Sequence, residues 1–211
     1  MRSLFILMLA VSLPAVAGSP EVQRVSPEAA PEAPPDTKPQ EAEPFTFRGL
    51  PWGATHAQVQ KALPRAKPAK KSDGLIVVDQ VAGIDSVLQF TFLGGGLAEI
   101  SVSFMAEHSN PNDLVFDFEK VKGLLLKKYG TPEVDRQRWN GSLYKDDYER
   151  RGQAVLTGQL TYRAVWKLKD TTISTMLTGD NFKSHHFVLY ESKASEAERK
   201  AQEEQKRLDE L

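Results

Sequence analysis

Three strand-like stretches lie in the first half of the chain, at residues 75–81, 86–93 and 97–105. The first is mostly β-branched, and apolar and polar residues alternate along the other two. In the last of them Ile100, Val102 and Phe104 fall on one face, with polar residues between them. A period of two predicts half-buried antiparallel strands. Three consecutive glycines, 94–96, predict a hairpin between the last two strands.

The same alternation returns near the C-terminus. It predicts strands at residues 160–168, 172–178 and 186–191, separated by turns at Lys169-Asp170 and at 179–181. Together the two sets indicate an antiparallel sheet of about six strands.

Two stretches carry a helical period instead. Thr55 and Gln58 have the spacing of a capping box, and Pro64 should end the helix that follows, over 56–63. Val59 and Leu63 would then face the core. Gly53 and Pro51 shape the approach, and Leu50 and Trp52 are expected to pack over the helix end.

The longer helix is predicted from Asn110-Pro111 to a cap at Gly130. Its apolar stripe consists of Leu114, Phe118, Val121 and Leu125, widened by Leu124.

The predicted fold is therefore α+β, with two helices packed on one face of the antiparallel sheet. The order of one helix and about three strands occurs twice, which is consistent with two α-βββ halves. We expect a single domain over residues 45–193. Residues 194–211 are charged and lack an apolar stripe, so they predict an exposed helical or frayed tail.

The N-terminal 44 residues predict export. Arg2, an apolar run and Ala15-Val16-Ala17 have the pattern of a cleaved signal peptide over residues 1–17. Residues 18–44, rich in Pro, Glu and Ala, predict a disordered linker. The chain has no cysteine, which excludes disulfides, thiolate chemistry and a lipid anchor on Cys. The expected location is the periplasm or the exterior of a bacterium, with no transmembrane span after signal cleavage.

One segment is unusually dense in arginine and aromatic residues, the types enriched at protein interfaces. Its members are Arg136, Arg138, Trp139, Tyr144, Tyr148, Arg150 and Arg151. They form either a partner-binding surface or a long hairpin whose aromatics cover the edge of the sheet. A basic run at residues 61–71 either contacts an anionic lipid or polymer, or is a solvated loop.

Catalytic chemistry has no clear signal. No nucleophile elbow, zinc-binding helix or calcium loop is present, and adjacent His185 and His186 on a strand would point to opposite faces. A pair of carboxylates meeting only in the fold stays open. The net charge of -1 offers no argument for nucleic-acid binding. We expect no enzyme activity and no cofactor or metal.

The stretch Gly49-Leu50-Pro51-Trp52-Gly53-Ala54-Thr55 resembles exported bacterial domains that open with a Gly-x-Pro-Trp-Gly-x-Ser/Thr helix start. More distantly, the predicted order is similar to the β-lactamase-inhibitor-protein fold and to BamE-like envelope proteins. This resemblance implies a binding module, with another envelope protein as partner. The alternative is a periplasmic carrier of a small molecule or lipid, with a pocket between helices and sheet.

Overall fold

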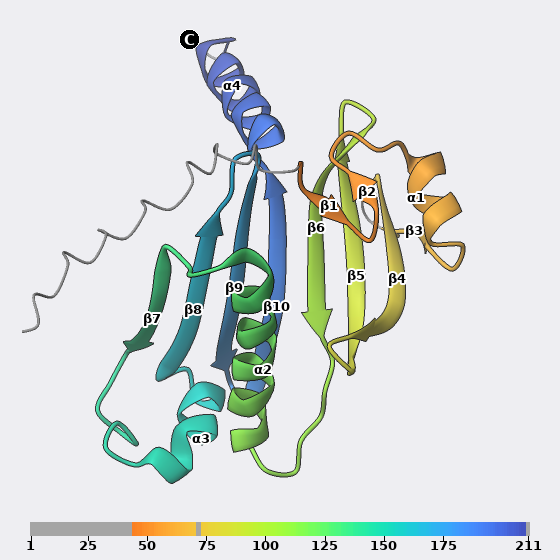
Figure 1. Ribbon diagram of the computed structural model, residues 1–211. Helices are drawn as coiled ribbons and strands as arrows, with labels where there is room; N and C mark the ends of the chain where they lie inside the picture. Colours follow the sequence, from red (N-terminus) through yellow and green to blue (C-terminus); the bar gives the residue numbers. More distant parts are fainter. Residues whose placement is uncertain (1–43, 71–72, 210–211) are drawn as a thin grey trace, which may run out of the picture. The chain divides into compact units, whose positions relative to one another are not determined.

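The centre of the structure is one sheet of eight strands in which every neighbouring pair is antiparallel. The computed structural model describes residues 44–70 and 73–209 (Figure 1). The strand order is β3-β4-β5-β6-β10-β9-β8-β7. The sheet therefore consists of two meanders, β4–β5–β6 and β8–β9–β10, that meet where β6 pairs with β10.

The bounds of the strands agree with the alternating stretches and extend them. The first three strands are short: β1 Thr46–Phe47, β2 Leu50–Pro51 and β3 Lys67–Pro68. The first meander comprises β4 Gly74–Val81, β5 Ile84–Leu93 and β6 Gly96–Phe104. The remaining strands are β7 Val134–Trp139, β8 Leu160–Lys167, β9 Thr171–Asp180 and β10 Lys183–Ser192.

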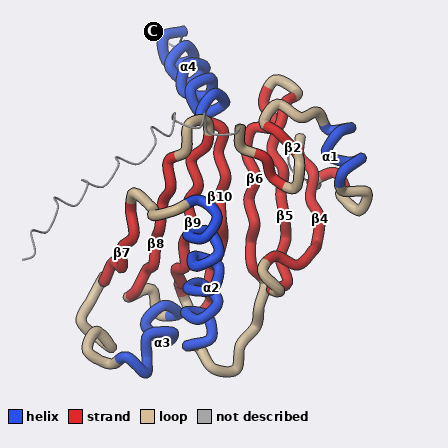
Figure 2. The backbone as a smooth tube through the Cα atoms, viewed as in Figure 1, coloured by secondary structure: helices blue, strands red, loops and turns tan. Residues whose placement is uncertain are grey.

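Four α-helices accompany the described strands. They are α1 His56–Ala62, α2 Asn112–Tyr129, α3 Arg151–Leu156 and α4 Lys193–Asp209. Figure 1 shows α2 in front of β9 and β10 and α3 near the lower ends of β8 and β9; α2 contacts β9 and β10, and α3 contacts β8, β9 and β10. The helix α4 continues from the end of β10 (Figure 2). It buries no residue, as its lack of an apolar stripe predicts.

The period-two pattern sorts the sheet into a covered face and an open face. On β10, His186, Val188 and Tyr190 are buried on the side that α2 covers, in register with Phe104, Val102 and Ile100 of β6. The intervening residues of β10 point to the other side and are only partly buried. We call this other side the open face, because the helices α1, α2 and α3 contribute their buried residues to the covered side.

The prediction of an α+β antiparallel fold is confirmed, but the expected number of about six strands is wrong. The strand β7 was missed because its residues are mostly exposed on both sides, so no alternation marks it. The strand β3 has only two residues, one of them a proline. A separate two-stranded hairpin, β1–β2, was also missed, for its strands have two residues each.

The helix signals in the sequence were accurate. Thr55 and Gln58 form the capping box, with the Gln58 side chain accepting from the Thr55 amide at 2.8 Å. In α2 the buried residues are the four of the predicted stripe, and Gly130 ends the helix. Leu124 is the exception: its side chain is 47% exposed, so the expectation that it widens the stripe is wrong.

The helix α3 is docked on α2 at a point where only glycine fits. A Cβ on Gly152 would lie 2.1 Å from the carbonyl of Pro111. Asn112, at the start of α2, accepts from the Gly152 amide at 2.8 Å and donates to the Glu149 carbonyl at 2.5 Å. Gly152 and Asn112, which are 40 residues apart in the sequence, thus hold α3 and the preceding turn in place.

The β1–β2 hairpin ties the N-terminal stretch to the sheet. Phe45 stacks on Trp52 with ring centroids 5.0 Å apart, and the Trp52 indole donates to the hydroxyl of Thr171 at 2.8 Å. Phe47 and Leu50 are buried. Trp52 is therefore a structural residue that links the N-terminal hairpin to β9, consistent with its expected packing role.

Some expectations fall on residues that the structure does not describe. The predicted signal peptide, almost all of the predicted linker and Lys71 of the basic run lie outside residues 44–70 and 73–209. Of the helices that are described, none combines the length and apolar content needed to span a membrane.

Candidate functional site

The seven arginine and aromatic residues singled out in the sequence occupy three different surroundings. Two belong to a hydrophobic cluster, three lie on the turn before α3 and at its start, and two lie on the open face of the sheet. The structure does not gather them into one patch.

Trp139 and Tyr144 are the two that pack inward. Both are partly buried against the cluster that joins α2 to α3 and β8, which includes Leu114, Phe118 and Leu160. Their apolar surface is already used by the fold.

The second group is satisfied mostly by local contacts. The guanidinium of Arg151 lies 4.4 Å from the ring centroid of Tyr148 and donates to Gln137 Oε1 at 2.9 Å. Arg150 pairs with Asp147 at 3.3 Å. These arginines stabilise the turn that leads into α3, although Tyr148 itself is highly exposed.

Arg136 and Arg138 differ from the others because they lie on the open face at the edge of the sheet. Arg136 is directly opposite Arg163 of β8, so two guanidinium groups occupy a cross-strand pair. Within the described part of the chain, none of these three arginines takes part in an ion pair. Like charges directly opposite each other destabilise a sheet. Nothing in the fold calls for the three arginines together; we name them the arginine cluster.

Apolar residues continue the same row across the open face. From Arg163 the register leads through Met176 and Phe187 to Ser103 and on to Val87 and Val78. The side chain of Val78 is 69% exposed, and those of Met176, Phe187 and Val87 are partly exposed. The open face therefore has a basic end and a largely apolar middle.

A third region of the open face is acidic. Glu99 of β6 and Glu191 of β10 are direct cross-strand partners, and Arg199 of α4 reaches them at 3.5 Å and 3.3 Å. Burial, and then the charge of Glu191, raise the pKa of Glu99. Here the protein supplies its own countercharge, in contrast to the arginine cluster.

Sequence inspection missed three members of this face: Arg163, Met176 and Phe187. The alternation over 160–168 does place Arg163 beside Thr161 and Val165 on one face. The missing information was the register, because Arg163 meets Arg136 only through the pairing of β7 with β8.

The histidines differ in their surroundings. His186 is buried without a hydrogen-bond partner at Nε2, and burial lowers its pKa to about 4. His108 binds Asp117 at 2.8 Å. His185 and His186 do point to opposite faces, as expected. Over residues 44–70 and 73–209 no three His, Asp or Glu side chains are grouped so that they could hold a metal ion.

Comparison with known proteins identifies no relative of this chain. No family model, no curated protein and no solved structure matches the chain. The resemblance to exported bacterial domains, and to the β-lactamase-inhibitor-protein and BamE-like folds, stays a prediction. The function is therefore inferred from the open face and its charges.

Proposed function

We propose that this protein is an exported, non-catalytic interaction module of the bacterial envelope that binds another protein through the open face of its sheet. The partner presents carboxylates to Arg136, Arg138 and Arg163. It covers the adjoining apolar row with apolar side chains of its own.

The observation that carries this proposal is the arginine cluster. A cross-strand pair of arginines without a countercharge destabilises the sheet, so the fold alone does not favour it. An incoming carboxylate removes the repulsion and gains charge-assisted hydrogen bonds, which arginine makes in a bidentate geometry.

The row from Met176 to Val78 supports a protein as the ligand. Protein interfaces combine an apolar centre with arginine and aromatic residues, and they are close to flat. A sheet face offers that shape, whereas small molecules favour concave sites. The balanced charge of the whole chain gives no support to nucleic acid.

The test is site-specific photo-crosslinking in the native host. A photo-reactive residue at Ser103, exposed in the middle of the open face, should give one protein adduct. The same residue at Phe116, which is 69% exposed on α2 at the other side of the molecule, should not.

Charge reversal then identifies the contact. The double variant R136E/R163E should abolish the Ser103 adduct and weaken binding of the purified partner by roughly tenfold or more. R207E, on the exposed helix α4, is the matched control and should bind normally. Equal adducts from Ser103 and Phe116, or binding that is insensitive to R136E/R163E, would overturn the proposal.

The carrier alternative makes a different prediction for the same experiment. A carrier would give no protein adduct from Ser103, whatever small molecule co-purifies with the mature chain. Export, and an arrangement of the domain as two α-βββ halves, are also part of this proposal. Export is tested by N-terminal sequencing of the mature protein, which should begin at Gly18.

A further inference from the structure

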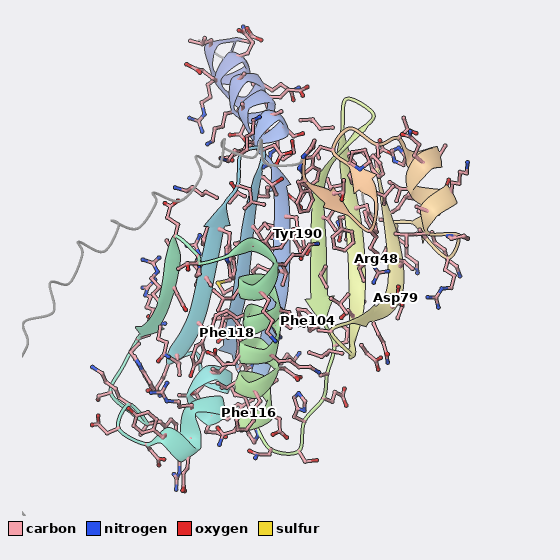
Figure 3. The ribbon with its side chains drawn as sticks, viewed as in Figure 1. Arg48, Asp79, Phe104, Phe116, Phe118 and Tyr190 are labelled. Atoms are coloured by element: carbon pink, nitrogen blue, oxygen red, sulfur yellow. The ribbon has the colours of Figure 1, made fainter. Side chains whose placement is uncertain are left out.

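On the covered side of the sheet, an apolar cleft lies between α2 and the first meander. Its volume is about 210 Å³. The floor is formed by β6 and β10, through Val102, Phe104, Val188 and Tyr190, and Leu124 of α2 forms part of the wall. Figure 3 shows Phe104, Tyr190 and Arg48 around this region, from β6, β10 and the β1–β2 turn.

Cations surround the cleft on two sides. Arg48, at the β1–β2 turn, and Lys128, near the end of α2, both line it. Lys120 of α2 reaches toward the β4–β5 turn, where its Nζ would lie 3.8 Å from a Cβ on Gly83. Neither lysine has an ion-pair partner among the described residues.

One carboxylate also lies nearby, and it is already engaged. Asp79 binds Arg48 and also pairs with Arg65 at 3.3 Å. The hydrogen bond from Arg48 lowers the pKa of Asp79, so this carboxylate stays ionised. Asp79 balances only part of the positive charge, so the potential beside the cleft favours an anion.

A polar group is also available inside the cleft. The Tyr190 side chain is buried, and its hydroxyl makes no hydrogen bond to any residue in the described ranges. Burial raises the pKa of Tyr190, so the hydroxyl stays protonated and can donate.

Two tight hairpin turns form one wall of the cleft. Arg48 has φ 52° and Ala82 has φ 56°, and each is followed by a glycine. Both residues line the cleft. Positive φ at both central residues is what a two-residue type I′ hairpin turn requires, so these turns fix the positions of Arg48 and Ala82 beside the cleft.

From these observations we infer that the cleft binds a single-chain fatty acid. The apolar floor takes the acyl chain, and the cations Lys120, Lys128 and Arg48 attract the carboxylate. The volume lies below the roughly 300–1,000 Å³ of sites for drug-sized ligands, which favours one medium-length chain over a two-chain lipid. This site is on the side of the sheet opposite the arginine cluster. The fatty-acid inference and the protein-binding proposal can therefore be contradicted independently of each other.

The binding experiment is calorimetric titration of the full mature chain with decanoate, below the concentration at which decanoate forms micelles. Decanol and decyltrimethylammonium, with the same chain length, test the role of the charge. We expect saturable binding of decanoate, weaker binding of decanol and none of the cation. Equal binding of the three, or no saturation with decanoate, would overturn the inference.

Two pairs of variants locate the site. L124W should fill the cleft and abolish decanoate binding, whereas L126W should not, since Leu126 has nearly the same exposure (46% against 47%) but does not line the cleft. K128E should weaken binding of decanoate roughly tenfold and K127E much less. Equal effects within either pair would show that the acyl chain binds elsewhere.

Discussion

The two meanders of the sheet are covered to different extents. The 18-residue helix α2 and the docked helix α3 cover β8, β9 and β10. The first meander has α1, only seven residues long, and the β1–β2 hairpin. The two meanders therefore have similar strands, but helices cover the second meander more completely than the first.

The difference accounts for where open space remains. Where α2 and α3 pack, the buried residues form a closed cluster with Leu160, Tyr162 and Leu177. Between α2 and the first meander the cover is incomplete, and the apolar cleft lies there. The candidate ligand site thus lies beside the less covered meander, whereas the arginine cluster lies on the open face of β7 and β8, at the well-covered end of the sheet.

The largest effect is expected where α2 packs on the second meander. Phe118 is fully buried, so F118A should lower the free energy of unfolding by about 3–5 kcal/mol. Val59, the buried residue of α1, loses less volume in V59A, for which we expect about 1–2 kcal/mol. Urea unfolding measures both. Equal losses would contradict the idea that α2 carries more of the stability than α1.

A second prediction concerns the boundary between the meanders. His186 of β10 stacks on Phe104 of β6 at 4.2 Å and lies 5.7 Å from Phe118 of α2. Burial lowers its pKa from 6.5 to about 4, while the charge of Asp117 acts in the opposite direction. The unfolded chain therefore binds the proton more tightly than the native protein.

Stability should consequently be highest above pH 6.5 and fall as the pH approaches 4. The full loss is about 3 kcal/mol, of which about 2 kcal/mol has occurred by pH 5. Urea unfolding at pH 7.5 and 5.0 measures it, and H186L should lack this part of the pH dependence. A wild-type protein that is equally stable at both pH values would show that His186 is not buried as a neutral group.

The third prediction tests how α3 is held. G152A places a Cβ against the Pro111 carbonyl and should cost about 1–3 kcal/mol. Gly123, on α2, has nothing within 4 Å of its Cβ position, so G123A should stabilise by about 0.5–1 kcal/mol. Thermal unfolding compares the two. A neutral G152A would mean that α3 is not docked closely on α2.

Much of the fold was predictable because it depends on local patterns. Five of the six long strands alternate visibly and β4 is rich in β-branched residues, and the α2 stripe and the Thr55–Gln58 capping box are short-range features. The strand β7 was not predictable, since an edge strand with polar residues on both faces has no period. Leu124 has helical spacing, yet it lies at the cleft, where the first meander brings no helix against it.

The candidate site was harder to predict than the fold. The density of arginine and aromatic residues from Arg136 to Arg151 was visible in the sequence. Density does not show which way each side chain points. Trp139 packs inward, and Arg151 binds Gln137. The partner of Arg136 is Arg163, 27 residues later and on another strand, and only the sheet register joins them.

The smallest effect is expected at the arginine cluster. R136E places a carboxylate opposite Arg163 and should raise the free energy of unfolding by about 0.2–1 kcal/mol, because it replaces a repulsive cross-strand pair by an attractive one. R138E is the matched control: Arg138 is opposite Thr161, so the gain should be smaller. Urea unfolding at low salt measures the difference, which high salt should reduce. A destabilised R136E would mean that the fold itself needs Arg136, and the argument that the cluster is kept for a partner would lose its basis.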